Sequence, residues 1–128
     1  MDKVLVDTSA WIDYFRKKEP VYSRVSTLLD DDKICCIGLV MAELIQGVKN
    51  RNGIKALEDF IYVFTFLEES AKLWAKAGEL SFTLGKAGKP VGLADCYIAI
   101  LANRNKVGLM TLDSHFRSIK EHVDIDLL

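Results

Sequence analysis

Along the whole chain, short apolar runs alternate with segments in which apolar residues recur at the spacing of a helix. Runs of about five apolar or β-branched residues are typical of strands that are buried on both faces of a parallel sheet. Such runs predict strands at residues 3–7, 33–37, 62–67 and 107–111, with a short fifth strand at residues 123–128.

The segments between these runs have apolar residues at three- and four-residue spacing, which predicts helices. The predicted helices cover residues 11–16, 20–29, 39–48, a short stretch ending at residue 60, 68–86, 93–102 and 113–122. Thr8 or Ser9 is the expected N-cap of the first helix. In the long helix at residues 68–86, Trp74 shares a stripe with Ala77 and Leu84, which predicts that Trp74 lies in the core.

Strands that alternate with helices predict an α/β fold. Most of the connections are longer than a dozen residues, so the strands are expected to be parallel, with helices on both faces. The expected architecture is a three-layer α/β/α sandwich with a central parallel sheet of four to five strands. The 128 residues suit one domain, residues 1–128. In such sheets a ligand binds beyond the carboxyl ends of the strands.

Four carboxylates stand where this pattern would place apolar or turn residues. Asp7 ends the first predicted strand, and Asp113 follows the apolar run of the fourth. Asp95 interrupts an apolar helix, and Glu43 lies one turn before Gly47 on another. Each acid also has a purely structural explanation. Asp7 and Asp113 could cap the helices that follow them, Asp95 could neutralise a helix N-terminus, and Glu43 could be a solvated helix residue. Together, at separations of about 6 Å, they would repel by roughly 3 kcal/mol per pair at an effective dielectric constant of 20, which favours a cation site.

The remaining residues narrow the chemistry. Oxygen ligands from separate elements suit Mg²⁺ or Mn²⁺, whereas a Ca²⁺ loop takes its ligands from about a dozen consecutive residues. Three cysteines, with Cys35 and Cys36 adjacent, lack the pattern of a disulfide framework or a zinc site. His115 and His122 lie in one predicted helix, and no Gly-x-Ser-x-Gly elbow occurs, which argues against a serine hydrolase. The pattern favours metal-assisted hydrolysis of a phosphodiester.

The net charge of −1 argues against a protein that coats duplex nucleic acid by bulk electrostatics, because that mode of binding needs a strongly basic surface. A nuclease remains compatible, because four acids gathered in one cleft leave the other surfaces mildly basic. The candidates to hold phosphates are Arg16, Lys17, Lys18, Lys49, Arg51, Lys86 and Lys89. No apolar stretch approaches the ~20 residues of a membrane span and no signal peptide is recognisable, so we expect a cytoplasmic protein with no membrane partner.

Successive motifs along nearly the whole chain carry a resemblance to a known family. They are Asp7-Thr8-Ser9 with Trp11-Ile12-Asp13, Glu43 with Gly47, Gly88-Lys89-Pro90 leading to Asp95-Cys96-Tyr97-Ile98-Ala99, and Thr111-Leu112-Asp113-Ser114-His115-Phe116. In their order, and in the small size of the chain, they resemble PIN-domain ribonucleases, in particular the VapC-type toxins of prokaryotic toxin–antitoxin pairs. The chain departs from that pattern in the bulk of Cys96 and Tyr97, and in lacking an arginine before Gly88 and Lys89.

The resemblance implies a Mg²⁺-dependent endoribonuclease that cleaves single-stranded or looped RNA, with Mn²⁺ as a substitute for Mg²⁺. Asp7, Asp95 and Asp113 would hold the metal. Glu43 would orient or deprotonate the attacking water, completing the catalytic quartet. The hydroxyls of Ser9 and Thr111 would line the site.

The resemblance also implies two protein partners. One is a VapB-like antitoxin, which could occupy a groove formed by apolar residues of the first two helices: Trp11, Ile12, Tyr14, Phe15, Val21, Tyr22 and Val25. The other is a second copy of the chain. The candidate faces of such a homodimer are Leu39, Val40, Leu44 and residues 93–102.

The competing class is a Mg²⁺-binding receiver-type phosphoacceptor domain, which also gathers carboxylates at strand ends. It would need adjacent acids after the first strand, an Asp at the end of the third, and a Lys after a late strand. Here Asp2 precedes the first strand, Phe66-Leu67-Glu68 ends the third, and no Lys follows the last. A catalytically inactive partner-binding module is a third class, against which the complete quartet argues.

Overall fold

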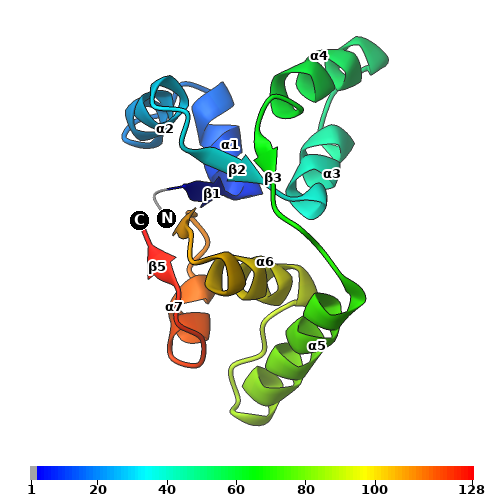
Figure 1. Cartoon of the computed structure of the whole chain (residues 1–128), viewed down its shortest axis with the longest axis vertical. Coiled ribbons are helices and arrows are strands. Elements are labelled where there is room, and N and C mark those ends of the chain that lie inside the picture. The colour runs from blue at the N-terminus through cyan, green and yellow to red at the C-terminus, as the bar shows by residue number, and fades with distance from the viewer. Residues whose placement is uncertain (1–2) are drawn as a thin grey trace.

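The computed structural model describes residues 3–128 and shows one sheet flanked by helices (Figure 1). The strands are β1 (Val4–Val6), β2 (Ile34–Cys36), β3 (Thr65–Phe66), β4 (Gly108–Met110) and β5 (Asp126–Leu127). The helices are α1 (Thr8–Phe15), α2 (Val21–Asp30), α3 (Gly38–Gln46), α4 (Arg51–Ile61), α5 (Ala71–Lys86), α6 (Leu93–Asn105) and α7 (His115–Lys120). Asp2, which entered the comparison with receiver domains, lies outside the described residues.

The sheet has the strand order β3-β2-β1-β4-β5, and every pair is parallel. From β1 the chain builds outward through β2 and β3, and then returns to the other side of β1 to form β4 and β5. The order therefore switches between β1 and β4, whose register pairs Val4 with Gly108 and Val6 with Met110. A crevice at the carboxyl ends of these two strands is the expected ligand site of an open parallel sheet.

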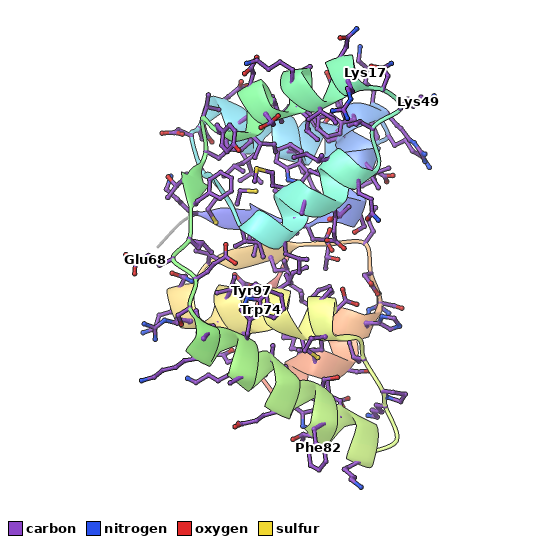
Figure 2. The ribbon with its side chains drawn as sticks, turned by 90° about the vertical axis from the view of Figure 1, so that its right-hand side faces the viewer. Lys17, Lys49, Glu68, Trp74, Phe82 and Tyr97 are labelled. Atoms are coloured by element: carbon purple, nitrogen blue, oxygen red, sulfur yellow. The ribbon has the colours of Figure 1, made fainter. Side chains whose placement is uncertain are left out.

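Helices cover both faces of the sheet. Helices α1 to α4 lie on one side and α5 to α7 on the other (Figures 1 and 2). The strands are short but apolar, and β1, β2 and most of β4 are buried. Trp11, Tyr97 and Phe116 are the largest fully buried side chains. The predicted three-layer α/β/α fold with a parallel sheet is confirmed.

Two local expectations were wrong. The third strand was predicted at residues 62–67, but β3 is only Thr65–Phe66, because Tyr62 caps α4 and Phe64 N donates to Ile61 O at 3.1 Å. Trp74 was predicted to lie in the core, yet 39% of its surface is exposed. Helix α5 buries a neighbouring stripe instead, made of Leu73, Ala77, Leu80 and Leu84.

The three cysteines are free and buried. Burial raises the pKa of the Cys35 thiol to about 11 and that of Cys36 to about 12, so both remain protonated and serve as packing residues. Within residues 3–128, no helix combines the length and the apolar character needed to cross a membrane.

Candidate metal centre

Asp7 is the only charged residue that the described chain buries, with 4% of its surface exposed. It directly follows β1, and its side chain caps α1 by accepting from Ala10 N at 3.1 Å. The expected cap, Thr8 or Ser9, was therefore one or two residues too late. The Asp7 carboxylate also accepts from Ser9 Oγ at 2.7 Å and from Thr111 Oγ1. The turn after β1 and the loop after β4 thus meet at this side chain.

Burial raises the pKa of the Asp7 carboxyl above its ordinary value. The hydrogen bonds from Thr111, Ser9 and Ala10 offset part of that rise, and the charge of Asp113 adds to it. Hydrogen-bond donors therefore stabilise the ionised Asp7 carboxylate, but none of these neighbouring groups is a cation. A carboxylate in that condition is stabilised by a cation.

Hydrogen bonds made by the hydroxyls of Thr111 and Ser9 join the loop after β4 to the turn after β1. Thr111 Oγ1 donates to Asp7 and accepts from Asp113 N at 3.0 Å. Ser9 Oγ accepts from Leu112 N at 2.9 Å. Both hydroxyls therefore lie at the acidic centre and hold the backbone that carries Asp113.

Asp95 and Asp113 come together at His115. Asp95 lies in the first turn of α6, Asp113 in the loop after β4, and His115 begins α7. His115 Nδ1 lies 3.2 Å from Asp95 Oδ2 and 3.3 Å from Asp113 Oδ1. One ligand atom from each of the three lies within 4.8 Å of the other two. The structure therefore brings into the cluster a histidine that was not among the predicted site residues.

Burial raises the pKa of the Asp95 carboxyl as well, the hydrogen bond from His115 lowers it, and the nearby Asp113 raises it further. Asp113 also accepts from His115 N at 2.9 Å, the first backbone amide of α7, although the N-cap residue of that helix is Ser114. Each of the three acids therefore also has a structural role: Asp7 caps α1, Asp95 lies at the N-terminus of α6, and Asp113 binds the first amide of α7. The only sequence signal for His115 was its position two residues after Asp113.

Glu43 is connected to the acidic centre by a hydrogen bond from Thr8. Its Oε1 atom accepts from Thr8 Oγ1 at 2.8 Å, and Thr8 is the residue next to Asp7. Within the described residues, no hydrogen bond joins Glu43 directly to the other three acids. Glu43 is half-buried, and it lies at the wall of a groove rather than inside the cluster. Thr8 was expected only as a cap, so its role as a link was missed.

The groove beside Glu43 has a volume of about 530 Å³ and lies between α1, α3 and α4. Ile12 and Phe15 line it and are exposed, at 38% and 45%. Arg16 and Lys49 contribute positive charge to its wall, and Lys49 projects at the edge of the molecule in Figure 2. Of the seven residues expected to form a partner groove, only Ile12 and Phe15 line it, because Trp11, Val21 and Val25 are buried in the core.

The other predicted phosphate-binding residues have different neighbours. Lys89 Nζ donates to Glu121 Oε2 at 2.8 Å, and Lys86 Nζ lies 5.5 Å from the centre of the Phe82 ring. Arg16 and Lys49 are the predicted phosphate-binding residues that line the same groove as Glu43.

The donor set fits a divalent metal. Carboxylate oxygens from the turn after β1, from α6 and from the loop after β4 are hard ligands, of the kind that Mg²⁺ and Mn²⁺ prefer. Burial, with a further contribution from the neighbouring Asp113, raises the pKa values of Asp7 and Asp95, so a nearby positive charge would stabilise their ionised forms. A cation at the point that Asp95, Asp113 and His115 share would supply it.

Comparisons with known proteins identify the family. A family model described as "PIN domain" matches residues 4–122. Ribonuclease VapC2 of Haemophilus influenzae is 28% identical over 124 residues, which cover 94% of this chain and 92% of the relative. Ribonuclease VapC1 of H. influenzae strain 86-028NP is 31% identical over 101 residues, or 74% of this chain and 75% of the relative. The structure of VapBC-1 from nontypeable H. influenzae aligns with a TM-score of 0.77 at 27% identity, covering 98% of this chain and 96% of that one.

Proposed function

The chain belongs to the PIN-domain family, and from this membership and its carboxylate cluster we propose that it is a Mg²⁺-dependent endoribonuclease, the toxin of a VapBC-type toxin–antitoxin pair. The observation that carries the proposal is the meeting of Asp95, Asp113 and His115 beside buried Asp7, at the switch point of the sheet. The proposed substrate is single-stranded or looped RNA, whose backbone can enter an open crevice.

A bound Mg²⁺ ion, or Mn²⁺ in its place, would lower the pKa of the attacking water and neutralise the charge that develops on the phosphate. Asp7, Asp95 and Asp113 are the proposed ligands, and His115 is within reach of the same point. Thr111 and Ser9 would keep the Asp7 carboxylate in its orientation, since each donates a hydrogen bond to it.

Glu43 is the proposed base. Thr8 holds its Oε1 atom, which leaves Oε2 to orient the water and accept its proton. The water oxygen then bonds to phosphorus while the bond from phosphorus to a bridging oxygen breaks, and solvent protonates the leaving oxygen. This role needs Glu43 to stand at a fixed distance from the three ligands although it lies on a different helix.

The receiver-type alternative is set aside. The flavodoxin-like order of receiver domains is 2-1-3-4-5, whereas this sheet has the order β3-β2-β1-β4-β5. The matched family model is also that of a PIN domain.

The groove between α1, α3 and α4 is the proposed site of a VapB-like antitoxin. Its exposed Ile12 and Phe15 suit the apolar face of an amphipathic helix, and Arg16 and Lys49 suit acidic residues at its border. Since Glu43 and Thr8 line the same groove, an occupant would also obstruct the proposed base.

A homodimer stays a prediction. Val40 and Leu44 face the chain's own core, so a charge placed at Val40 would unfold the protein rather than test an interface. Light scattering of the wild type is the cleaner measurement. A mass of twice 14.4 kDa would support the dimer, and a mass near 14.4 kDa at every concentration would exclude it.

The proposed function is tested with purified protein and a fluorophore–quencher RNA. Cleavage should require Mg²⁺ or Mn²⁺, stop in EDTA, and be lost in Asp95→Asn. Glu79→Gln is the matched control, because it removes one carboxylate charge from an exposed position of α5. Undiminished cleavage in EDTA, or equal activity in Asp95→Asn and the control, would refute the proposal. A single-stranded DNA of the same sequence tests whether RNA is preferred.

A further inference from the structure

We infer that Glu69 is a positioning residue of the proposed catalytic centre, because its carboxylate ties the helix that carries Glu43 to the helix that carries Asp95. Glu69 lies between β3 and α5, in the segment that crosses from the α1–α4 side of the molecule to the α5–α7 side (Figure 1). One oxygen binds the start of α3, and the other binds a tyrosine of α6. The inference rests on the proposed function.

The start of α3 has no cap of its own. Its N-cap residue is Ile37, whose side chain has no hydrogen-bonding atom. Gly38 N donates instead to Glu69 Oε2 at 3.0 Å, across 31 residues of chain. A Cβ atom at Gly38 would lie 3.3 Å from that oxygen, so glycine allows the carboxylate to approach closely. A negative charge at this position also stabilises the positive end of the α3 dipole.

The second oxygen fixes α6 through Tyr97. The Tyr97 ring is buried, and its hydroxyl donates to Glu69 Oε1. Trp74 of α5 stacks on the same ring, with centroids 3.5 Å apart and planes 7° from parallel (Figure 2). The stack sets the direction in which the hydroxyl points.

The two tied positions lie close to the proposed catalytic residues. Gly38 precedes Glu43 by five residues on α3, and Tyr97 follows Asp95 by two on α6. Since an α-helix moves as a rigid unit over these distances, a shift of the start of α3 is passed on to Glu43. Thr8 provides the local restraint on the Glu43 side chain, and Glu69 provides the restraint on its helix.

The test compares Glu69→Ala, Glu69→Gln and the control Glu68→Ala, all as full-length protein with melting curves to confirm folding. Glu68 is the adjacent exposed carboxylate, and within the described residues it forms no side-chain hydrogen bond or ion pair. We expect Glu69→Ala to lower kcat about tenfold with little change in KM, since misplacing a catalytic group by 1 Å costs up to about 100-fold. Glu69→Gln keeps an acceptor for Gly38 N and should restore kcat to within about threefold of wild type. Glu68→Ala should match wild type.

Two further measurements separate positioning from a general loss of structure. Hydrogen exchange of a peptide covering the start of α3 should become faster in Glu69→Ala and stay unchanged in Glu68→Ala. In a double-mutant cycle with Thr8→Val, which frees the Glu43 side chain, the effect of Glu69→Ala on kcat should shrink. Tyr97→Phe, which removes only the link to α6, should lower kcat less than Glu69→Ala does.

Several results would overturn the inference. They are equal kcat in Glu69→Ala and Glu68→Ala, an effect of Glu69→Ala that is undiminished in the Thr8→Val background, or faster exchange in α3 with unchanged kcat. In each of these cases the wild type and Asp95→Asn could still behave as proposed, so the nuclease function would stand. Absence of metal-dependent cleavage by the wild type would overturn both proposals.

Discussion

Replacing Asp95 by asparagine should abolish cleavage and at the same time stabilise the metal-free protein. The ligand atoms of Asp95 and Asp113 lie within 4.8 Å of each other. Two unit charges at that distance repel by roughly 3 kcal/mol at an effective dielectric constant of 20 and by roughly 1 kcal/mol in water. The two side chains are 23% and 33% exposed, so we take a value of about 1–2 kcal/mol, between these limits.

Two smaller terms act in the opposite direction. Asp95 lies in the first turn of α6, where a negative charge contributes about 0.3–1 kcal/mol to helix stability. The variant also weakens the hydrogen bond to His115 Nδ1, which is charge-assisted when the imidazole is protonated. We therefore expect Asp95→Asn to raise the free energy of unfolding in EDTA by about 1 kcal/mol, or to raise the melting temperature by about 3–5 °C for a domain of this size.

Mg²⁺ should reverse this difference in stability, so that the wild type becomes more stable than Asp95→Asn. At a Mg²⁺ concentration of about 100 times Kd, binding stabilises the wild type by about 2.7 kcal/mol, and the variant should lose most of that gain. The assay is thermal unfolding with EDTA and with Mg²⁺, followed by RNA cleavage, where we expect a loss of about 100-fold or more. Glu79→Gln controls for the loss of one surface charge. The reasoning is refuted if Asp95→Asn is less stable than the wild type in EDTA, or if Mg²⁺ stabilises both equally.

Three further predictions follow from the same geometry. Asp7→Asn should also abolish cleavage while the protein stays folded, because asparagine can still accept from Ala10 N; a cleaving variant would remove Asp7 from the ligand set. The pKa of Asp7 is raised above 3.8 in the folded state, so its ionisation opposes folding as pH rises through that value. Without metal, the stability advantage of Asp7→Asn over the wild type should therefore grow between about pH 4 and pH 7, and an advantage that shrinks over this range in urea unfolding would contradict the sign. Phe15→Glu should weaken binding of the product of an adjacent reading frame by about tenfold or more and leave cleavage by the free protein unchanged, which calorimetry and the RNA assay would check.

The sequence by itself determined the fold class and the place of the site. Apolar runs and helical stripes are local patterns, and their alternation requires long crossovers and therefore a parallel sheet. Asp7 directly follows β1 and Asp113 lies in the loop after β4, and parallel strands end at one edge of a sheet, so their proximity could be inferred without coordinates. Asp95 was marked by its interruption of an apolar helix and Glu43 by Gly47 one turn later, and the family motifs then grouped both with Asp7 and Asp113.

Only the tertiary structure decided which side chains surround those acids. Thr8 binds Glu43 across 35 residues, Thr111 binds Asp7 across 104, and Glu69 binds Tyr97 across 28. Trp74 was predicted to lie in the core because helical spacing gives the face of a helix only to within about one residue, and His115 was not among the predicted site residues. The packing of α6 against α5 and α7 then placed His115 in the cluster and turned Trp74 onto Tyr97. Contacts of this kind depend on how whole elements pack, and a local pattern contains no information about their relative rotation.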